Sequence, residues 1–146
     1  MIYDLLKRHE GVRKKPYKCP AGFLTVGVGW NIDANPLPKD IAAYLKKNGE
    51  ITDDMVDRLL FISVGAATLN CYGLFPDFEN FTENRQMALI DFVFQLGGAG
   101  AAKFVNSIAM INTGRWEDAA ENMMKSAWAK QTPKRAAEIT QMIEEG

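Results

Sequence analysis

The spacing of apolar positions changes along the chain and separates a short helix, a β-rich segment and a long helical remainder. Residues 2–10 place apolar side chains on one face at helical spacing, and Gly11 stands where a helix commonly ends. Residues 17–28 alternate instead with a period of two around a Pro-Ala-Gly turn at 20–22. Two alternating runs joined by a turn predict a β-hairpin.

The remainder of the chain is predicted to be helical, and several helix ends are marked by capping residues. Helices are expected over residues 38–47, 52–70, 82–96, 105–112, 115–127 and 133–144. Thr52 and Thr82 are typical N-cap residues, and Thr132 precedes a proline in the first helical position. The segment after Thr82 is apolar nearly all round, as in a buried central helix, and the glycines within 97–100 should end it.

These elements predict a mostly helical α+β fold, formed by one domain with two lobes. We expect a small lobe at about 11–52, a connecting helix at about 53–70, and a helical lobe at about 71–146 together with helix 2–10. The length of 146 residues fits a single domain on the usual range of about 100–200 residues. A cleft between two lobes is a common place for a binding site.

Composition and charge exclude several classes of protein. Hydrophobic residues make up 47% of the chain and charged residues 24%, which is ordinary for a soluble globular protein. The 17 basic and 18 acidic residues give a net charge of −1, which argues against a dedicated nucleic-acid binder. No apolar run approaches the ~18 residues of a membrane span, and the first residues lack the apolar core of a signal peptide. We therefore expect a cytoplasmic protein without a membrane span.

The cysteine and histidine content argues against a disulfide framework and against a zinc site. Cys19 and Cys71 are too few for a framework and have no metal-ligand spacing, and His9 is the single histidine. A Ser-His-Asp triad is not credible either, because His9 has no nucleophile motif to serve. We expect two free thiols, with Cys71 buried near the end of the connecting helix, and neither a metal nor a cofactor.

Glu10 is the first candidate for chemistry. It lies at the C-terminal end of the first predicted helix, where the helix dipole disfavours a negative charge. That position, together with partial burial, would raise the pKa of its carboxyl and suit it to act as a general acid. Taken alone, the feature fits an ordinary surface glutamate at a frayed helix end more often than a catalyst.

Cys19 and Thr25 lie on the two arms of the predicted hairpin and could face each other. A threonine hydroxyl can orient a water molecule, and a cysteine with a lowered pKa can act as a base or a nucleophile. The commoner role of both residue types in a strand is simple packing. Trp30 and Trp128 also allow two interpretations, of which a place in the core is favoured over stacking against sugars.

The spacing of these candidates resembles the catalytic pattern of phage-type lysozymes, the endolysins of glycoside hydrolase family 24. Glu10 is followed after eight intervening residues by Cys19, and after five more by Thr25. The resemblance extends from residue 2 nearly to the end of the chain. It is carried by residues 9–13, 17–18, 22–29, 92–97, 103–107, 126–128 and 131–135.

The resemblance implies two lobes joined by a long helix and a peptidoglycan cleft between them. It implies inverting hydrolysis of the β-1,4 bond between N-acetylmuramic acid and N-acetylglucosamine. Glu10 would be the general acid, Cys19 would occupy the position of the family's usual aspartate, and Thr25 would position the water. It further implies a monomer that leaves the cytoplasm of an infected host cell through a holin-type pore.

The resemblance also assigns roles to residues of the helical segments. Arg135 matches an arginine that pairs with the catalytic glutamate, and Trp128 matches a tryptophan packed behind that glutamate. Positions that line the family's sugar-binding cleft are matched by Asn31, Phe94, Gln95, Ser107 and Asn122.

One departure from the family pattern keeps two alternatives open. Cys19 replaces a carboxylate, and a thiol with a pKa of ~8.5 is mostly neutral at pH 7 unless its surroundings perturb it. A lytic transglycosylase needs only the acid and releases a 1,6-anhydro sugar, so it is the first alternative. The second is a relative that binds peptidoglycan without turnover. The net charge of −1 also predicts weak long-range attraction to an anionic cell wall.

Overall fold

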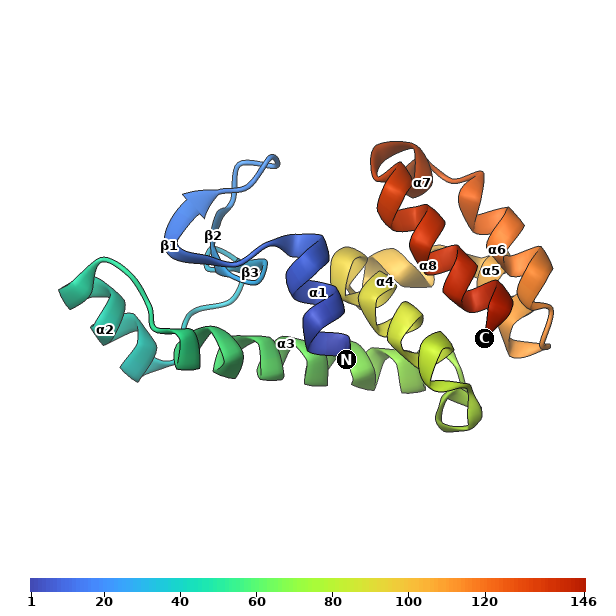
Figure 1. Cartoon of the computed structure of the whole chain (residues 1–146), viewed down its shortest axis with the longest axis horizontal. Helices are drawn as coiled ribbons and strands as arrows, with labels where there is room; N and C mark the ends of the chain where they lie inside the picture. Colours follow the sequence, from blue (N-terminus) through green and yellow to red (C-terminus); the bar gives the residue numbers. More distant parts are fainter. The chain divides into compact units, whose positions relative to one another are not determined.

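The computed structural model describes all residues from 1 to 146, and contacts along the chain divide it into two units. The first comprises Tyr3–Ser63 with Met1, and the second comprises Val64–Gly146 with Ile2. Eight α-helices and one small sheet confirm the predicted mostly helical α+β class (Figure 1). The elements are α1 (Ile2–Glu10), β1 (Arg13–Lys18), β2 (Leu24–Gly27), β3 (Trp30–Asn31), α2 (Lys39–Asn48), α3 (Asp53–Leu74), η1 (Phe78–Asn80), α4 (Glu83–Ala102), α5 (Val105–Asn112), α6 (Trp116–Met124), α7 (Ala127–Gln131) and α8 (Pro133–Glu145).

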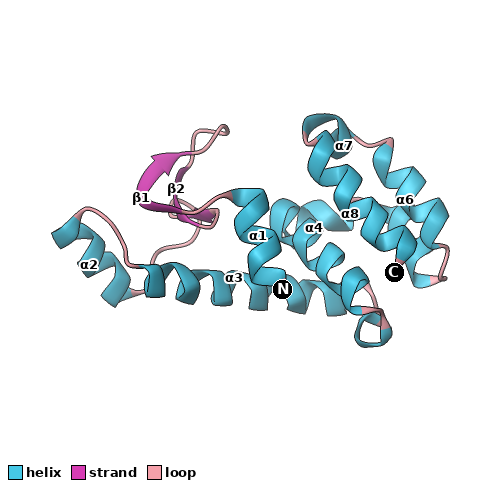
Figure 2. Ribbon diagram, viewed as in Figure 1, coloured by secondary structure: helices cyan, strands magenta, loops and turns pink.

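The first unit contains the whole sheet, an antiparallel arrangement in the order β1-β2-β3 (Figure 2). The predicted hairpin is therefore correct but incomplete, because β3 adds a third strand. The chain reverses from β2 into β3 through Gly27 and Gly29, whose φ angles of 68° and 69° are readily reached only by glycine. Strand β3 has only two residues, which are too few to show an alternating pattern in the sequence.

Helix α2 and the first half of α3 complete the first unit, and the start of α3 follows from local sequence. The Thr52 hydroxyl accepts a hydrogen bond from the Met55 N–H at 3.1 Å, which confirms the predicted cap of α3. The Ile51 N–H donates to the Lys14 carbonyl at 2.9 Å and ties the start of α3 to β1. Buried side chains of this unit come from β2, the turn after it, α2, the loop before α3, and α3, and include Val26, Val28, Ile41, Ile51, Leu59 and Leu60.

In the second unit, α4 contains a continuous buried stretch from Ala88 to Val93, as its apolar sequence predicts. It begins at Thr82, whose hydroxyl accepts a hydrogen bond from the Arg85 N–H at 3.2 Å. The predicted end of the helical segment after Leu96 is confirmed at Gly97, but a second helical segment that was not predicted follows it. Gly97 adopts a φ of 75° and interrupts the helix, which then resumes as far as Ala102. Glycine tolerates this conformation, so the chain kinks at Gly97 between the two helical segments.

The predicted helix over 115–127 extends beyond the observed α6, and a second short helix that follows it was not predicted. Helix α6 ends at Met124, and Ser126 caps the new helix α7 by accepting a hydrogen bond from the Ala129 N–H at 3.3 Å. The next helix, α8, begins at Pro133 as predicted. Helix α8 packs against α4, α6 and α7 (Figure 1).

No single helix of the structure is both long and apolar enough to cross a membrane, although α4 and α5, bent by 110° at their junction, reach the required length and hydropathy as a pair.

Candidate active site

Glu10 is the last residue of α1, and its side chain lies against the turn that follows β2. The helix ends at Gly11, whose N–H donates to the Lys7 carbonyl at 2.9 Å. A methyl group on Gly29 would lie 3.2 Å from Oε1 of Glu10 and 3.4 Å from its Cδ. The carboxyl therefore rests on a backbone that carries no side chain, and any larger residue at Gly29 would press against it.

The Cys19 thiol lies in the turn between β1 and β2, surrounded by hydrogen-bond donors. Hydrogen bonds to the sulfur lower the pKa of the thiol. The largest effect comes from the Phe23 N–H, and smaller ones come from the Ala21 N–H, the Thr25 hydroxyl and the Gly22 N–H. Desolvation raises the pKa, but it does not outweigh these bonds together. The turn is held by two backbone bonds, from the Cys19 N–H to the Phe23 carbonyl at 2.9 Å and from the Gly22 N–H to the Cys19 carbonyl at 2.8 Å. A turn of this kind presents its N–H groups to an anion, as a backbone nest does.

The Thr25 hydroxyl has two competing acceptors. It donates to the Phe23 carbonyl at 3.0 Å, and it also lies within hydrogen-bond reach of the Cys19 sulfur. A hydroxyl carries a single proton, so it serves one acceptor at a time. An ionised sulfur is the stronger acceptor, and ionisation of Cys19 therefore favours the bond from Thr25 to sulfur.

Asn31 lies beside Thr25 in the neighbouring strand, because the two residues are opposite each other in the pairing of β2 with β3. Its Oδ1 accepts a hydrogen bond from the Ala34 N–H at 3.0 Å, which fixes the side-chain amide. Cys19, Thr25 and Asn31 thus occupy adjacent places on one small sheet and its first turn. The prediction that Cys19 and Thr25 lie on opposing arms of the hairpin is wrong for Cys19, which follows the end of β1 and lies in the turn, while the residue opposite Thr25 is Tyr17.

The structure brings four of the other predicted site residues together as two pairs within the second unit. Trp128 Nε1 donates to Gln95 Oε1 at 2.8 Å, and Asn122 Nδ2 donates to Ser107 Oγ at 2.8 Å. Trp128 is also buried between Phe92 and Phe104, with edge-to-face contacts at centroid distances of 4.9 and 6.3 Å. Aromatic edges and faces attract each other in this geometry, so Trp128 belongs to the core.

Two further aromatic candidates, Trp30 and Phe94, are at least half-buried. Trp30 is buried, and its Nε1 donates to the Asn35 carbonyl at 2.9 Å. The interpretation of both Trp30 and Trp128 as core residues is confirmed. Phe94 follows the buried segment of α4 and is half-buried itself.

Arg135 forms a buried ion pair that sequence analysis missed. Its Nε donates to Asp91 Oδ1 at 2.8 Å, and the exposed fractions of the two side chains are 10% and 0%. Asp91 stands in the middle of the buried apolar part of α4. A buried carboxylate requires a partner, so an acidic residue within an apolar helix was the signal that could have predicted this pair.

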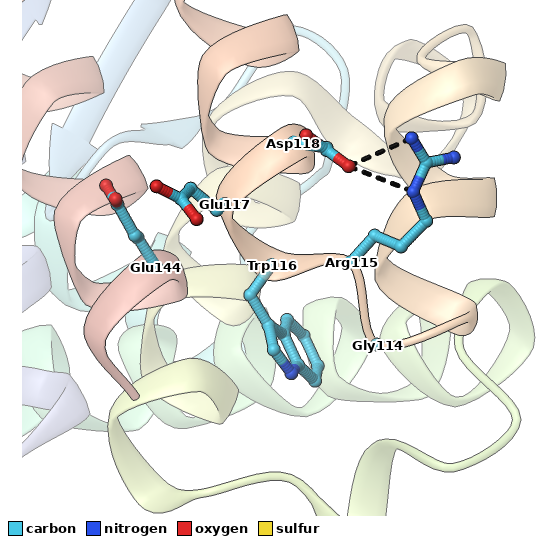
Figure 3. Close-up of a pocket in the computed structure, with 6 residues that line it drawn as sticks. All are labelled: Gly114, Arg115, Trp116, Glu117, Asp118 and Glu144. Carbon is cyan, nitrogen blue, oxygen red and sulfur yellow. Dashed lines mark hydrogen bonds and ion pairs between the residues drawn. The ribbon is translucent and has the colours of Figure 1, made fainter.

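The pocket in Figure 3 lies elsewhere in the second unit and contains none of the predicted site residues. Its volume is about 470 Å³, and it is lined by Gly114, Arg115, Trp116, Glu117, Asp118 and Glu144. Its single drawn ion pair joins the guanidinium of Arg115 to Asp118 Oδ2 at 2.9–3.0 Å, and both side chains are exposed. No group of three or more His, Cys, Asp or Glu side chains is arranged to hold a metal ion.

Comparison with known proteins gives consistent matches over almost the whole chain. The family model described as phage lysozyme matches residues 7–141. Probable T4-type lysozymes 2 and 1 of Dictyostelium discoideum are each 31% identical over 160 residues, which cover 99% of this chain and 94% of each relative. The pre-baseplate central spike protein Gp5 of Enterobacteria phage T4 is 30% identical over 159 residues, which cover 96% of this chain and 27% of that protein.

The buried pair of Asp91 and Arg135 should be important for stability. We expect Asp91→Ala to lower the free energy of unfolding by about 3–5 kcal/mol, because it removes the carboxylate of a buried ion pair. Asp118→Ala, which breaks the exposed pair with Arg115, should cost less than about 1 kcal/mol. Urea denaturation followed by circular dichroism measures both variants. Equal losses in the two variants would contradict the buried role of Asp91.

Proposed function

The chain belongs to the phage lysozyme family, and from this premise we propose that it is a muramidase of bacterial peptidoglycan. It is a glycoside hydrolase, and the proposed reaction is inverting hydrolysis of the β-1,4 bond between N-acetylmuramic acid and N-acetylglucosamine. The observation that carries the proposal is the family match over residues 7–141, which includes Glu10, Cys19 and Thr25 at the family's catalytic spacing. The hydrogen-bonded surroundings of Cys19 support the same assignment.

Glu10 acts as the general acid in this proposal. An inverting glycosidase needs an acid that protonates the leaving-group oxygen on one side of the sugar and a base that activates water on the other. The close approach of Gly29 limits the positions that the Glu10 carboxyl can take. A confined side chain delivers its proton in one direction, which favours catalysis through orientation.

Cys19 acts as the base that activates the water. As the water oxygen attacks the anomeric carbon, one of its protons passes to the Cys19 thiolate, while Glu10 gives its proton to the departing sugar oxygen. The N–H groups of Phe23, Ala21 and Gly22 favour the thiolate that this step requires. Loss of the thiol proton to solvent and uptake of a proton by Glu10 then restore the starting state.

Thr25 positions the water in the same proposal. When its hydroxyl donates to the Cys19 sulfur, the lone pairs of Oγ1 remain able to accept a hydrogen bond from water. Thr25 is almost fully buried, so its position is fixed by the surrounding sheet. The water would then lie between the threonine oxygen and the sulfur that takes its proton.

The other residues of the predicted set bind sugar or support the site in this proposal. Side-chain amides, a hydroxyl and an aromatic ring are the groups that commonly recognise sugars, and they are supplied by Asn31, Phe94, Gln95, Ser107 and Asn122. Trp128 and Arg135 act as supporting residues, since one holds Gln95 and the other is anchored by Asp91.

Analysis of the sugars released from purified peptidoglycan tests the proposed reaction. We expect mass spectrometry to find reducing-end muramic acid, because water attacks the anomeric carbon. Glu10→Gln should lower the rate by at least about 100-fold, which is the usual contribution of a general acid. Anhydro-muramic acid would identify a lytic transglycosylase instead, and release of no sugar at all would contradict an active muramidase.

The pH dependence tests the role of Cys19. Because the pKa of its thiol is lowered, the thiolate should form at a lower pH than in an ordinary cysteine. We expect Cys19→Asp to remain active with its pH optimum moved to lower pH, since an aspartate ionises near ~3.9. Cys19→Ala should lose most of its activity at every pH. An unchanged pH profile in Cys19→Asp would show that Cys19 is not the base.

Alkylation provides a second test of Cys19 in the same chain. Burial raises the pKa of the Cys71 thiol to about 12, so this residue should resist iodoacetamide in the native state. We expect the label to enter Cys19 and activity to fall in parallel, as followed by mass spectrometry. Cys71→Ala should behave in the same way and is the matched control. Full labelling of Cys19 without loss of activity would overturn its catalytic role.

Gly29 tests the positioning of Glu10. A methyl group at this position would meet Glu10 Oε1 at 3.2 Å, so Gly29→Ala should displace the carboxyl and lower kcat by about 10-fold or more. Gly49→Ala is the matched control, because Gly49 also has a positive φ but nothing within 4 Å of an added methyl group. Both variants should lose a similar amount of thermal stability. Equal loss of kcat in both would attribute the effect to backbone strain alone.

A further inference from the structure

Helix α3, the long green helix of Figure 1, exposes an apolar face along much of its length. Its four large exposed side chains, with their exposed fractions, are Phe61 (69%), Ile62 (46%), Leu69 (74%) and Tyr72 (47%). Between Ile62 and Leu69 the exposed residues are Gly65 and Ala66. A surface helix ordinarily turns charged and polar side chains to water, so a face of this composition indicates an interaction surface.

Gly65 lies at the centre of this apolar face. Phe61 and Leu69 are each four residues away from it, and helical geometry places them about 40° to either side. Glycine destabilises the interior of a helix relative to other residues, and a methyl group at Gly65 would meet no atom of the chain within 4 Å. The packing of the chain itself therefore does not require glycine here, whereas the close approach of a second helix does.

The area of the face is sufficient for a weak but specific contact. At about 200 Å² for a large side chain, the exposed fractions correspond to an apolar patch of the order of 500 Å². Two such patches packed on each other would bury about 1,000 Å² in total, which is near the lower limit of specific interfaces. Because both copies would use the same face, the contact closes after two chains and does not propagate.

A second copy in the antiparallel orientation fits the order of side chains along the face. A twofold axis at Gly65 brings Phe61 of one copy to the level of Leu69 of the other, because each lies four residues, or about 6 Å, from Gly65. The two side chains lie on opposite sides of the contact line, so they pack beside each other without a clash. The two Gly65 residues meet at the centre, where the helices approach most closely.

The electrostatic match lies at the ends of the same contact. Arg58 and Tyr72 are each seven residues from Gly65, so the twofold axis places the guanidinium of one copy next to the phenol ring of the other. Arg58 Nη1 donates to Asp40 Oδ2 at 2.7 Å, which holds the guanidinium and leaves its faces open to a ring. A parallel arrangement would instead bring the two Arg58 cations together, so the charges favour the antiparallel one.

We propose that the chain forms a homodimer in which two copies pack their α3 helices antiparallel about Gly65. This interface departs from the monomer that the resemblance of the sequence implies, and it does not depend on the proposed function. The buried area is small and association also has an entropic cost, so the dissociation constant is on the order of 10–100 µM. The chain is then monomeric when dilute and dimeric when concentrated.

Two glycines of α3 provide a matched pair of variants. Gly65 and Gly73 are both exposed, and neither has an atom within 4 Å of an added methyl group. Gly73 lies about 80° around the helix from Gly65 and next to its last residue, outside the centre of the contact. Sedimentation velocity at concentrations from the micromolar to the millimolar range measures the association of Gly65→Gln, Gly73→Gln and the unaltered chain.

The expected result separates association from stability. Gly65→Gln should weaken the dimer at least about ten-fold, because its side chain holds the two helices apart. The same variant should melt at a higher temperature than the unaltered chain when both are monomeric, because glutamine is the better helix former. Gly73→Gln should dimerise as the unaltered chain does. A monomer at every concentration, or equal association of the two variants, would overturn the proposal.

A mixing experiment tests the antiparallel order. Phe61→Lys and Leu69→Glu each place a charge in the apolar contact, so each variant alone should associate at least about ten-fold more weakly. In an equal mixture the new ammonium of one copy lies beside the new carboxylate of the other, and association should return to within about three-fold of the unaltered chain. Both positions are exposed and both new residues are good helix formers, so the variants should fold.

Val105→Lys is the matched control for the mixing experiment. Val105 lies on α5 and is 68% exposed, close to the value for Phe61, so it receives the same charge at a similar apolar position outside α3. This variant should dimerise as the unaltered chain does. Equal weakening in Val105→Lys would place the interface elsewhere and overturn the proposal. A mixture of Phe61→Lys and Leu69→Glu that fails to associate would also overturn it.

Discussion

The antiparallel pairing of β1 with β2 is the constraint on which the candidate site depends. Because Tyr17 lies opposite Thr25, the chain that continues from β1 brings Cys19 next to β2, and the turn wraps its N–H groups around the sulfur. The return from β2 to β3 requires a positive φ at Gly29, and this backbone then lies directly against the Glu10 carboxyl. One small sheet therefore sets the surroundings of both groups that are proposed to move protons.

Charge in this chain acts through its local arrangement and not through its total. Asp91 is buried within an apolar helix and is tolerable there because Arg135 donates to it at 2.8 Å. At the surface the opposite situation holds, since the exposed pair of Arg115 and Asp118 costs little to form and contributes little. A net charge near zero conceals both features. The position of each charge relative to solvent decides how much it contributes to the fold.

Local sequence predicted the elements well wherever a local interaction determines them. Thr52 and Thr82 cap their helices by hydrogen bonds to residues three positions away, so the sequence alone contains both partners. The kink at Gly97 could not be distinguished from a helix end, because the outcome depends on what the following segment packs against. Gly98 shows this dependence, since a methyl group there would meet Asn70 at 2.6 Å. The contact between Gly29 and Glu10 is equally non-local.

Because Cys19 stands where the family usually has a carboxylate, the proposed base depends on the surrounding turn for its ionisation. A carboxylate is charged at neutral pH without help, whereas a thiol becomes an effective base only when its surroundings favour the anion. The three backbone N–H groups and the Thr25 hydroxyl supply that preference without any basic side chain. Backbone donors do not titrate, so they favour the thiolate equally at every pH. In this chain the geometry of the turn performs the task that the carboxylate performs through its own acidity.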